Sequence, residues 1–325
     1  MFSIKKILVP TDFSDNASRA YSHAQQIAGR YDAKVDFIHV IPSFQYLGES
    51  LKQLGAPLDM EKDLYPHAQK RASQKINELM ETYVQSENKG TSFVKIAPKP
   101  SKAISEHAAK NEYDLIVMAA KGLHNSEFLQ GSITEKVIRY SKVPVLHTDK
   151  PAIENIKHIL VPTDGSQASL QALPMAISIA LKHGASIILY HVLELHGSQT
   201  ENFKKNTHKT EAENIRDVIY DAMDKFFKSF WNQAKLNRLD SFDGQIMIEE
   251  GDSKVIVSIN AVIEKRMSAH NAITEYSDEH ADLIIMATHG RSGLSHLLLG
   301  STAEKVVQYS TIPTVTIQPE LTGKS

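Results

Sequence analysis

The segment ILVPTDFS at residues 7–14 returns almost unchanged as ILVPTDGS at residues 159–166, 152 residues further along the chain. The same spacing relates the pair His39-Val40 to His191-Val192. A repeat unit of this length is too long for a solenoid, whose units have about 20 to 45 residues. The sequence therefore predicts a whole domain that has been duplicated.

The spacing between the copies increases toward the end of the chain. DLIVMA at residues 114–119 returns as DLIIMA at residues 282–287, 168 residues later, so the second copy has gained 16 residues in between. Gly131-Ser132 returns as Gly300-Ser301, 169 residues later, so one further residue has been gained. The first difference predicts an insertion, and the second changes the spacing of a glycine motif.

These spacings predict two domains, residues 1–150 and residues 151–325, each long enough to bury its own core. The insertion falls at about 244–266, where two strand-like runs flank Gly251-Asp252-Ser253 and predict a β-hairpin. This hairpin is either a peripheral decoration or an oligomer contact that uses its exposed edge.

Each copy alternates strand-like and helical stretches. An apolar run closed by proline, such as residues 7–10, is typical of a buried parallel strand. The next stretch, from Ser14 to about Tyr31, carries small and apolar residues at helical spacing. Strands that alternate with helices form parallel sheets through right-handed crossovers. We therefore predict an α/β fold with two tandem, Rossmann-like, five-stranded and mostly parallel sheets that carry helices on both faces.

The carboxyl ends of the predicted strands carry the residues of a candidate site. Ligands bind at this edge of such sheets, where the strand order reverses. In the second copy Gly290 follows a strand, and Gly300-Ser301 opens a helix whose free N–H groups and dipole favour a phosphate. With Pro162-Thr163-Asp164 on the neighbouring strand, this arrangement predicts a mononucleotide site.

The string ATHGRSGLS at residues 287–295, followed by LLLGS at residues 297–301, resembles the universal stress protein family, and nearly the whole chain resembles a member with two tandem domains. The family's ATP-binding members carry Gly-x2-Gly-x9-Gly-Ser/Thr. The second copy reads Ala287-x2-Gly290-x9-Gly300-Ser301, so the spacing is kept and only the first glycine is replaced, by alanine.

This resemblance implies a fold of the adenine nucleotide alpha hydrolase type and a set of ligand contacts. Pro162, Thr163 and Asp164 would wall the adenine and ribose, and the Val192 backbone would bond the adenine edge. Met286 would pack on the base, and Ala287 lies under the ribose. The phosphates of ATP, usually carrying a divalent ion such as Mg²⁺, would be held by Gly290, Gly300, Ser301 and Thr302.

The first copy departs further from the family pattern. It reads Ala119-x2-Gly122-x8-Gly131-Ser132, one residue short, and this loss could misplace Gly122 relative to Gly131. We therefore expect weaker nucleotide binding here than in the second copy. The matching residues of the adenosine site are retained, so an adenosine or another ligand remains open for this copy; they are Pro10, Thr11, Asp12, Val40 and Met118.

Composition narrows the classes of partner and of chemistry. The 325 residues include 36 basic and 38 acidic side chains, so nucleic acid is not expected as a main ligand. The chain has no cysteine, which excludes disulfides and thiolate metal sites. No stretch predicts a membrane span or a signal peptide, so we expect a cytoplasmic protein without a membrane partner.

Three functions fit these observations. The favoured one is an ATP-binding stress or signalling protein whose nucleotide changes its conformation or its partners. A slow ATPase or nucleotidyl-handling enzyme is the second, weakened because no phosphate-loop lysine motif is present. A dimerisation module without nucleotide is the third. The resemblance also implies that the domains pair through their last strands, Val143–His147 and Thr314–Ile317, and it leaves a homodimer open.

Two pairs of matching residues have plainer interpretations. Asp12 and Asp164 stand where they would cap the following helices, and we assign them no catalytic role. His39 and His191 occupy matching strand positions and are interpreted as hydrogen-bonded core histidines. The spacing of His183, His191 and His196 gives no recognisable metal-ligand pattern.

Overall fold

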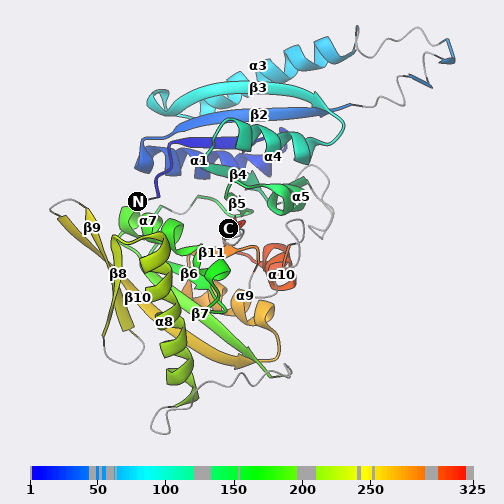
Figure 1. Cartoon of the computed structure of the whole chain (residues 1–325). Coiled ribbons are helices and arrows are strands. Elements are labelled where there is room, and N and C mark those ends of the chain that lie inside the picture. Colours follow the sequence, from blue (N-terminus) through cyan, green and yellow to red (C-terminus); the bar gives the residue numbers. More distant parts are fainter. Residues whose placement is uncertain are drawn as a thin grey trace. The chain divides into compact units, whose positions relative to one another are not determined.

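The structure is a computed structural model that describes residues 2–43, 49–50, 53–55, 62, 64–120, 133–152, 154–195, 210–239, 243–250, 253–289 and 299–319. The chain divides into two compact units (Figure 1). Residues 3–152 form one unit, called here the first domain. Residues 153–325, together with residues 1–2, form the other, called here the second domain.

The first domain is built on a parallel sheet with the strand order β3-β2-β1-β4-β5. The order reverses between β1 and β4, which makes the carboxyl ends of these strands the expected ligand edge. Its elements are β1 (Lys6–Pro10), α1 (Ala17–Tyr31), β2 (Lys34–Pro42), α3 (Tyr65–Tyr83), the 3₁₀ turn η2 (Ser86–Asn88), β3 (Lys89–Ala97), α4 (Pro100–Lys110), β4 (Leu115–Ala119), α5 (Ile133–Tyr140) and β5 (Val145–Thr148).

The second domain repeats this plan and extends it. Its strand order is β12-β11-β6-β7-β10-β9-β8, parallel as far as β10 and antiparallel beyond. Its elements are β6 (His158–Pro162), α6 (Gln167–Leu170), α7 (Leu173–His183), β7 (Ser186–Glu194), α8 (Glu211–Phe230), β8 (Ala234–Arg238), β9 (Asp243–Glu250), β10 (Ser253–Arg266), α9 (Ala269–His280), β11 (Leu283–Ala287), α10 (Ser301–Tyr309) and β12 (Thr314–Ile317).

The repeated apolar run forms the central strand of each sheet. Ile7, Leu8 and Val9 of β1 are fully buried, as are the matching residues 159–161 of β6. Continuous burial on both faces is typical of a parallel strand that is covered by helices on either side. The predicted α/β class and the mostly parallel sheets are therefore confirmed.

The second sheet differs from the prediction of five strands. In the described part of the chain it has seven. Strand β10 pairs in parallel with β7 over residues 259–266, the place that β3 occupies beside β2 in the first domain. These residues therefore belong to the repeated plan. The extra residues form β8, β9 and the start of β10, which pairs antiparallel with β9. The predicted boundary of about 244–266 is corrected accordingly.

The reason for this difference is that one 14-residue strand has two roles. The start of β10 is one arm of the added hairpin, and its end is a core strand of the parallel sheet. Alternating apolar residues fit both roles equally well, so periodicity does not reveal where one ends and the other begins.

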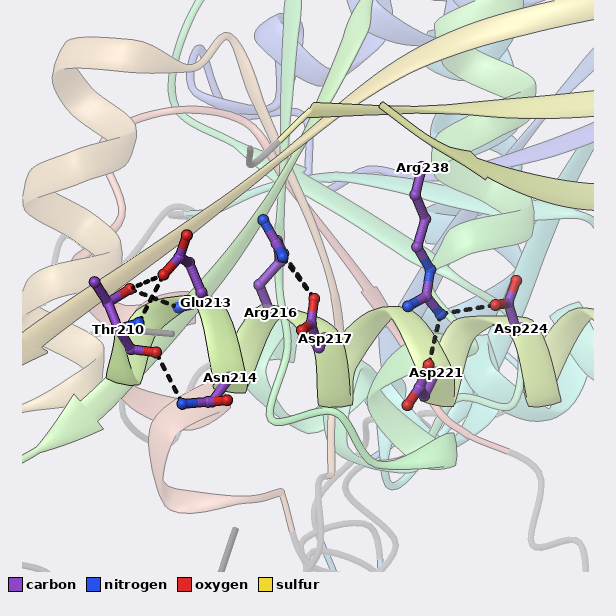
Figure 2. A network of polar contacts seen from close by, with 8 residues as sticks. All are labelled: Thr210, Glu213, Asn214, Arg216, Asp217, Asp221, Asp224 and Arg238. Atoms are coloured by element: carbon purple, nitrogen blue, oxygen red, sulfur yellow. Dashed lines mark hydrogen bonds and ion pairs between the residues drawn. The ribbon is translucent and has the colours of Figure 1, made fainter. Parts of the chain in front are cut away.

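Charged side chains on α8 fasten the added strands to the domain (Figure 2). The helix starts with a capping box, in which Thr210 accepts from the Glu213 N–H and the Glu213 carboxylate accepts from the Thr210 N–H. Further along, Nη2 of Arg238, the last residue of β8, donates to Asp221 at 2.6 Å and to Asp224 at 2.8 Å. This clamp holds the edge strand against the helix.

We expect the substitution Arg238→Met to lower the free energy of unfolding of the second domain by about 1 kcal/mol, because two half-exposed ion pairs are lost together. Urea unfolding followed by Trp231 fluorescence measures this change. Lys228→Met is the matched control, since Lys228 is an exposed cation on α8, the helix that Arg238 contacts. Equal effects of the two substitutions would show that the clamp contributes nothing beyond a surface charge.

Candidate functional site

The carboxyl ends of β6, β7 and β11 and the start of α10 enclose a pocket of about 290 Å³ in the second domain. This volume lies at the lower end of the range for small-molecule sites. Nine of the residues predicted for the second-copy site line it; they are Pro162, Thr163, Asp164, Val192, Met286, Ala287, Gly300, Ser301 and Thr302. The tenth, Gly290, lies outside the described residues.

The turn after β6 is fixed by short-range hydrogen bonds. The Thr163 hydroxyl accepts from the Gly165 N–H at 3.0 Å and lies 2.8 Å from the Ser169 hydroxyl. Asp164 Oδ1 accepts from the Ser166 N–H at 2.9 Å. Gly165 has a φ of +75°, which glycine adopts without strain. The Asp164 side chain thus lies at the pocket wall in a turn with little freedom.

The start of α10 supplies backbone donors to the other side of the pocket. Gly300 is the N-cap of this helix and, as a glycine, has no side chain with which to cap the first turn. Ser301, Thr302 and Ala303 follow it and line the pocket, so the helix N-terminus is directed at the cavity. N–H groups and the dipole at such an end favour an anion.

Gly300 is required for a reason that the sequence interpretation did not include. Its N–H donates to the Thr288 carbonyl at 2.9 Å, and a Cβ on Gly300 would meet that same carbonyl oxygen at 3.0 Å. Because α10 packs this closely against the end of β11, a side chain at this position would push the two apart by at least a few tenths of an ångström. The glycine acts through this packing, in addition to any space that it leaves for a ligand.

The pocket also includes residues that were not predicted. His191, interpreted above as a core histidine, lines the pocket, and its Nδ1 lies 2.8 Å from the Thr163 carbonyl. Ala269 and Ile273 of α9 form another wall of the pocket. The sequence did not predict them, because the end of β10 and the helix that follows it were not recognised as part of the repeat. The remaining lining residues are Ser169, Tyr190, Thr288, His289 and Ala303.

Hydrogen bonds of Tyr190 connect β7 to β10 and α9 next to the pocket. The Tyr190 hydroxyl donates to Glu264 at 3.0 Å and lies 3.3 Å from the Ala272 carbonyl of α9. Burial, followed by this contact with Glu264, raises the pKa of Tyr190 well above its ordinary value. Burial alone would also raise the pKa of Glu264, but hydrogen bonds from Arg266 and Tyr190 outweigh it and lower that pKa. The phenol is thus neutral and the carboxylate charged at neutral pH.

The first domain builds the same turn at the end of β1. Ser14 N–H donates to Asp12 Oδ1 at 3.0 Å, and His39 Nδ1 lies 2.7 Å from the Thr11 carbonyl. The main difference is Phe13, which replaces Gly165, has a φ of +63° and places its ring 4.5 Å from His39. Nζ of Lys75 in α3 lies over the Phe13 ring, 5.3 Å from its centroid.

The other residues predicted for the first-copy site are only partly described. Pro10, Val40, Met118 and Ala119 lie at or next to the carboxyl ends of β1, β2 and β4, as expected. The Thr134 hydroxyl of α5 donates to the Ala119 carbonyl at 3.0 Å. The residue of the second domain that matches Thr134 is Ala303, which lines the pocket. Gly122, Gly131 and Ser132 lie outside the described residues, so the effect of the shortened loop stays a prediction.

Within the described residues, no group of three or more histidine, aspartate or glutamate side chains is arranged to hold a metal ion. None of the helices in the described part of the chain is both long and apolar enough to cross a membrane.

Comparison with known protein families gives two matches along the chain. Residues 3–148 and residues 155–318 each match the model of the universal stress protein family. Among curated relatives, a universal stress protein of Mycolicibacterium smegmatis is 22% identical over 317 residues, which cover 96% of this chain and 97% of the relative. The universal stress protein MJ0531 of Methanocaldococcus jannaschii is 34% identical over 156 residues, 46% of this chain and 85% of the relative.

Among solved structures, a universal stress protein from Archaeoglobus fulgidus has a similar fold. It superimposes with a TM-score of 0.62 at 20% sequence identity, and the match covers 98% of this chain and 97% of that structure. The likeness therefore extends through both domains.

Proposed function

Because the chain belongs to the universal stress protein family, we propose that it is a nucleotide-binding member in which the second domain binds ATP. In this proposal, bound ATP changes the conformation or the partners of the protein in a stress response or in signalling. The first domain, with its altered glycine motif, binds nucleotide more weakly or takes another ligand. The protein acts in the cytoplasm, as the sequence led us to expect.

One observation carries the proposal. Nine residues that the family resemblance implies around the ATP come from four separate segments of the chain, and all nine line a single pocket. Val192 and Met286 provide the backbone and apolar surface that suit a flat base. Asp164 provides an acceptor for ribose hydroxyls, and the start of α10 provides donors for phosphate.

The donor chemistry also fits a magnesium ion carried by the phosphates. Mg²⁺ binds through hard oxygen ligands and usually keeps several waters, with substrate phosphates completing its shell. Ser301 and Thr302 offer hydroxyl oxygens at the phosphate end of the pocket. When bound, the ion neutralises phosphate charge, which the α10 N–H groups alone would do only in part.

The proposal is one of binding rather than turnover. Among the described lining residues Asp164 is the only carboxylate, and its Oδ1 accepts the Ser166 N–H in the turn. Phosphoryl transfer needs a group that positions an attacking nucleophile next to a charge-stabilising donor set. A slow ATPase is the alternative, and a nucleotide-free interaction module is the second alternative. Pairing of the last strands and a homodimer stay predictions of the family resemblance.

A titration of nucleotide-stripped protein with ATP, ADP, adenosine and GTP, each with Mg²⁺, tests the proposal. We expect saturable binding of the adenine compounds and much weaker binding of GTP. Phosphate release measured in the same samples separates binding from turnover. Absence of adenine nucleotide binding would contradict the proposal and support the interaction module, whereas release at a rate that depends on the pocket residues would support the ATPase.

A further inference from the structure

The imidazole of His191 occupies a position in the sheet that a backbone amide would otherwise fill. In the parallel ladder between β6 and β7, the Thr163 N–H donates to the Tyr190 carbonyl at 2.9 Å. Backbone groups of a strand alternate between its two edges, so Val192 turns its N–H and C=O to the same edge as Tyr190. A regular continuation of the ladder would place the Val192 N–H on the Thr163 carbonyl.

The Thr163 carbonyl has a side-chain donor in this structure. His191 Nδ1 lies 2.8 Å from it, and because a carbonyl oxygen only accepts, Nδ1 carries the hydrogen. The imidazole can therefore satisfy the carbonyl in place of the Val192 amide. Val192 lines the pocket beyond the end of β6. Its N–H and C=O, which point to this edge of the strand, can then serve a ligand in the pocket.

The same contact is present in the other copy. His39 Nδ1 lies 2.7 Å from the Thr11 carbonyl, and the Thr11 N–H donates to the Ile38 carbonyl at 2.9 Å. A histidine at this position thus ends the ladder in the same way in two domains whose surrounding residues differ. The repetition favours a role in shaping the turn over a chance packing contact.

We propose that His191 is a positioning residue for the second-domain ligand: its Nδ1–H holds the Thr163 carbonyl so that the Asp164 turn and the Val192 backbone face the pocket. This inference rests on the proposed function. It means that binding of the base and the ribose depends on His191, a residue outside the glycine motif. The role requires a donor at the Nδ1 position and does not require a positive charge.

Variants of His191 separate this role from general support of the fold. In His191→Asn, the amide nitrogen takes a position close to that of Nδ1, whereas in His191→Gln it lies nearer to that of Nε2. His191→Leu removes the donor altogether. Loss of one net hydrogen bond that organises the site corresponds to about a tenfold change in affinity. We expect His191→Leu and His191→Gln to weaken adenosine and ATP binding by about tenfold each, and His191→Asn to remain within about threefold of the wild type.

The matched control is His39→Leu, which removes the same contact from the first domain. It should leave the second-domain affinity for adenosine unchanged while altering thermal stability to a similar extent as His191→Leu. If His191→Leu does not fold, the comparison of the Asn and Gln variants still decides. Equal affinities of the Asn and Gln variants, or unchanged binding by His191→Leu, would overturn the inference. A wild-type protein that binds no adenosine and no ATP would instead contradict the proposed function itself.

Discussion

Replacing Gly300 by valine should reduce the affinity of the second domain for ATP by at least about 100-fold. A Cβ at this position meets the Thr288 carbonyl oxygen at 3.0 Å, and the branched valine side chain adds two further methyl groups. The start of α10 must then move away from the end of β11, and its N–H groups move with it. Hydrogen bonds to charged groups contribute about 1.5–3 kcal/mol each, so displacing two of them accounts for a loss of this size.

Two companion variants make this result interpretable. Gly300→Ala adds the Cβ alone and should give a smaller loss, because a few tenths of an ångström of movement relieve the contact. Gly131→Val, the matching change in the first domain, should leave ATP binding by the second domain intact. Titration calorimetry with ATP and Mg²⁺ measures all three. Equal losses for Gly300→Val and Gly131→Val would contradict the asymmetry between the copies.

The second large effect is a loss of stability in mild acid that is caused by His107. Its ring is buried on α4 and lies 4.6 Å from Phe93, and Nδ1 lies 3.2 Å from the Asn111 amide. Burial, together with the nearby charge of Lys95, lowers the pKa of His107 to about 4 from the ordinary value of 6.5. Between about pH 4 and pH 6.5, the unfolded chain therefore binds a proton on His107 that the folded chain does not bind.

The sign of the effect follows from this difference. Above about pH 6.5 both states are neutral at this residue, and the folded state has its full stability. As the pH falls from 6.5 toward 4, the unfolded state is progressively favoured. Between pH 7 and pH 5 we expect a single such histidine to cost about 2 kcal/mol of unfolding free energy. His147 adds to the trend, because its burial also lowers its pKa to about 4.

Urea unfolding at pH 7 and pH 5, followed by far-ultraviolet circular dichroism, measures this dependence. His107→Leu should remove about 2 kcal/mol of the pH effect, since the variant has no group to protonate. His67→Gln is the control, because His67 is exposed on α3 and its replacement should leave the pH effect unchanged. A His107→Leu protein with the same pH dependence as the wild type would show that this ring is not held neutral by the fold.

Much of the fold could be predicted because the repeated segments lie on central strands. Residues 7–10 and 159–162 carry an unbroken apolar signal, and their neighbours in the sheet follow from the alternation of strands and helices. The end of the insertion could not be predicted, because β10 continues from the hairpin into the parallel sheet without a break in its pattern. Only the pairing of residues 259–266 with β7 shows where the repeat resumes.

The candidate site shows a similar division. Residues at the carboxyl ends of strands, such as Thr163 and Met286, were predictable from their position in the topology. His191 was interpreted as a hydrogen-bonded core histidine from its matching strand position in the two copies. That position does not reveal that its partner is the Thr163 carbonyl at the edge of the pocket. The contribution of α9, through Ala269 and Ile273, depended on a helix start that follows only from the correct bounds of β10.

We propose that the second domain of this chain holds ATP and that the first does so weakly or not at all. The most direct test saturates nucleotide-stripped protein with ATP and Mg²⁺, separates free nucleotide, denatures the protein and quantifies the adenine nucleotide released per chain. We expect a ratio close to one, which the substitution Gly300→Val abolishes. Two results would contradict this proposal. One is a ratio near two that is halved by Gly300→Val and equally by Gly131→Val, and the other is the release of no nucleotide at all.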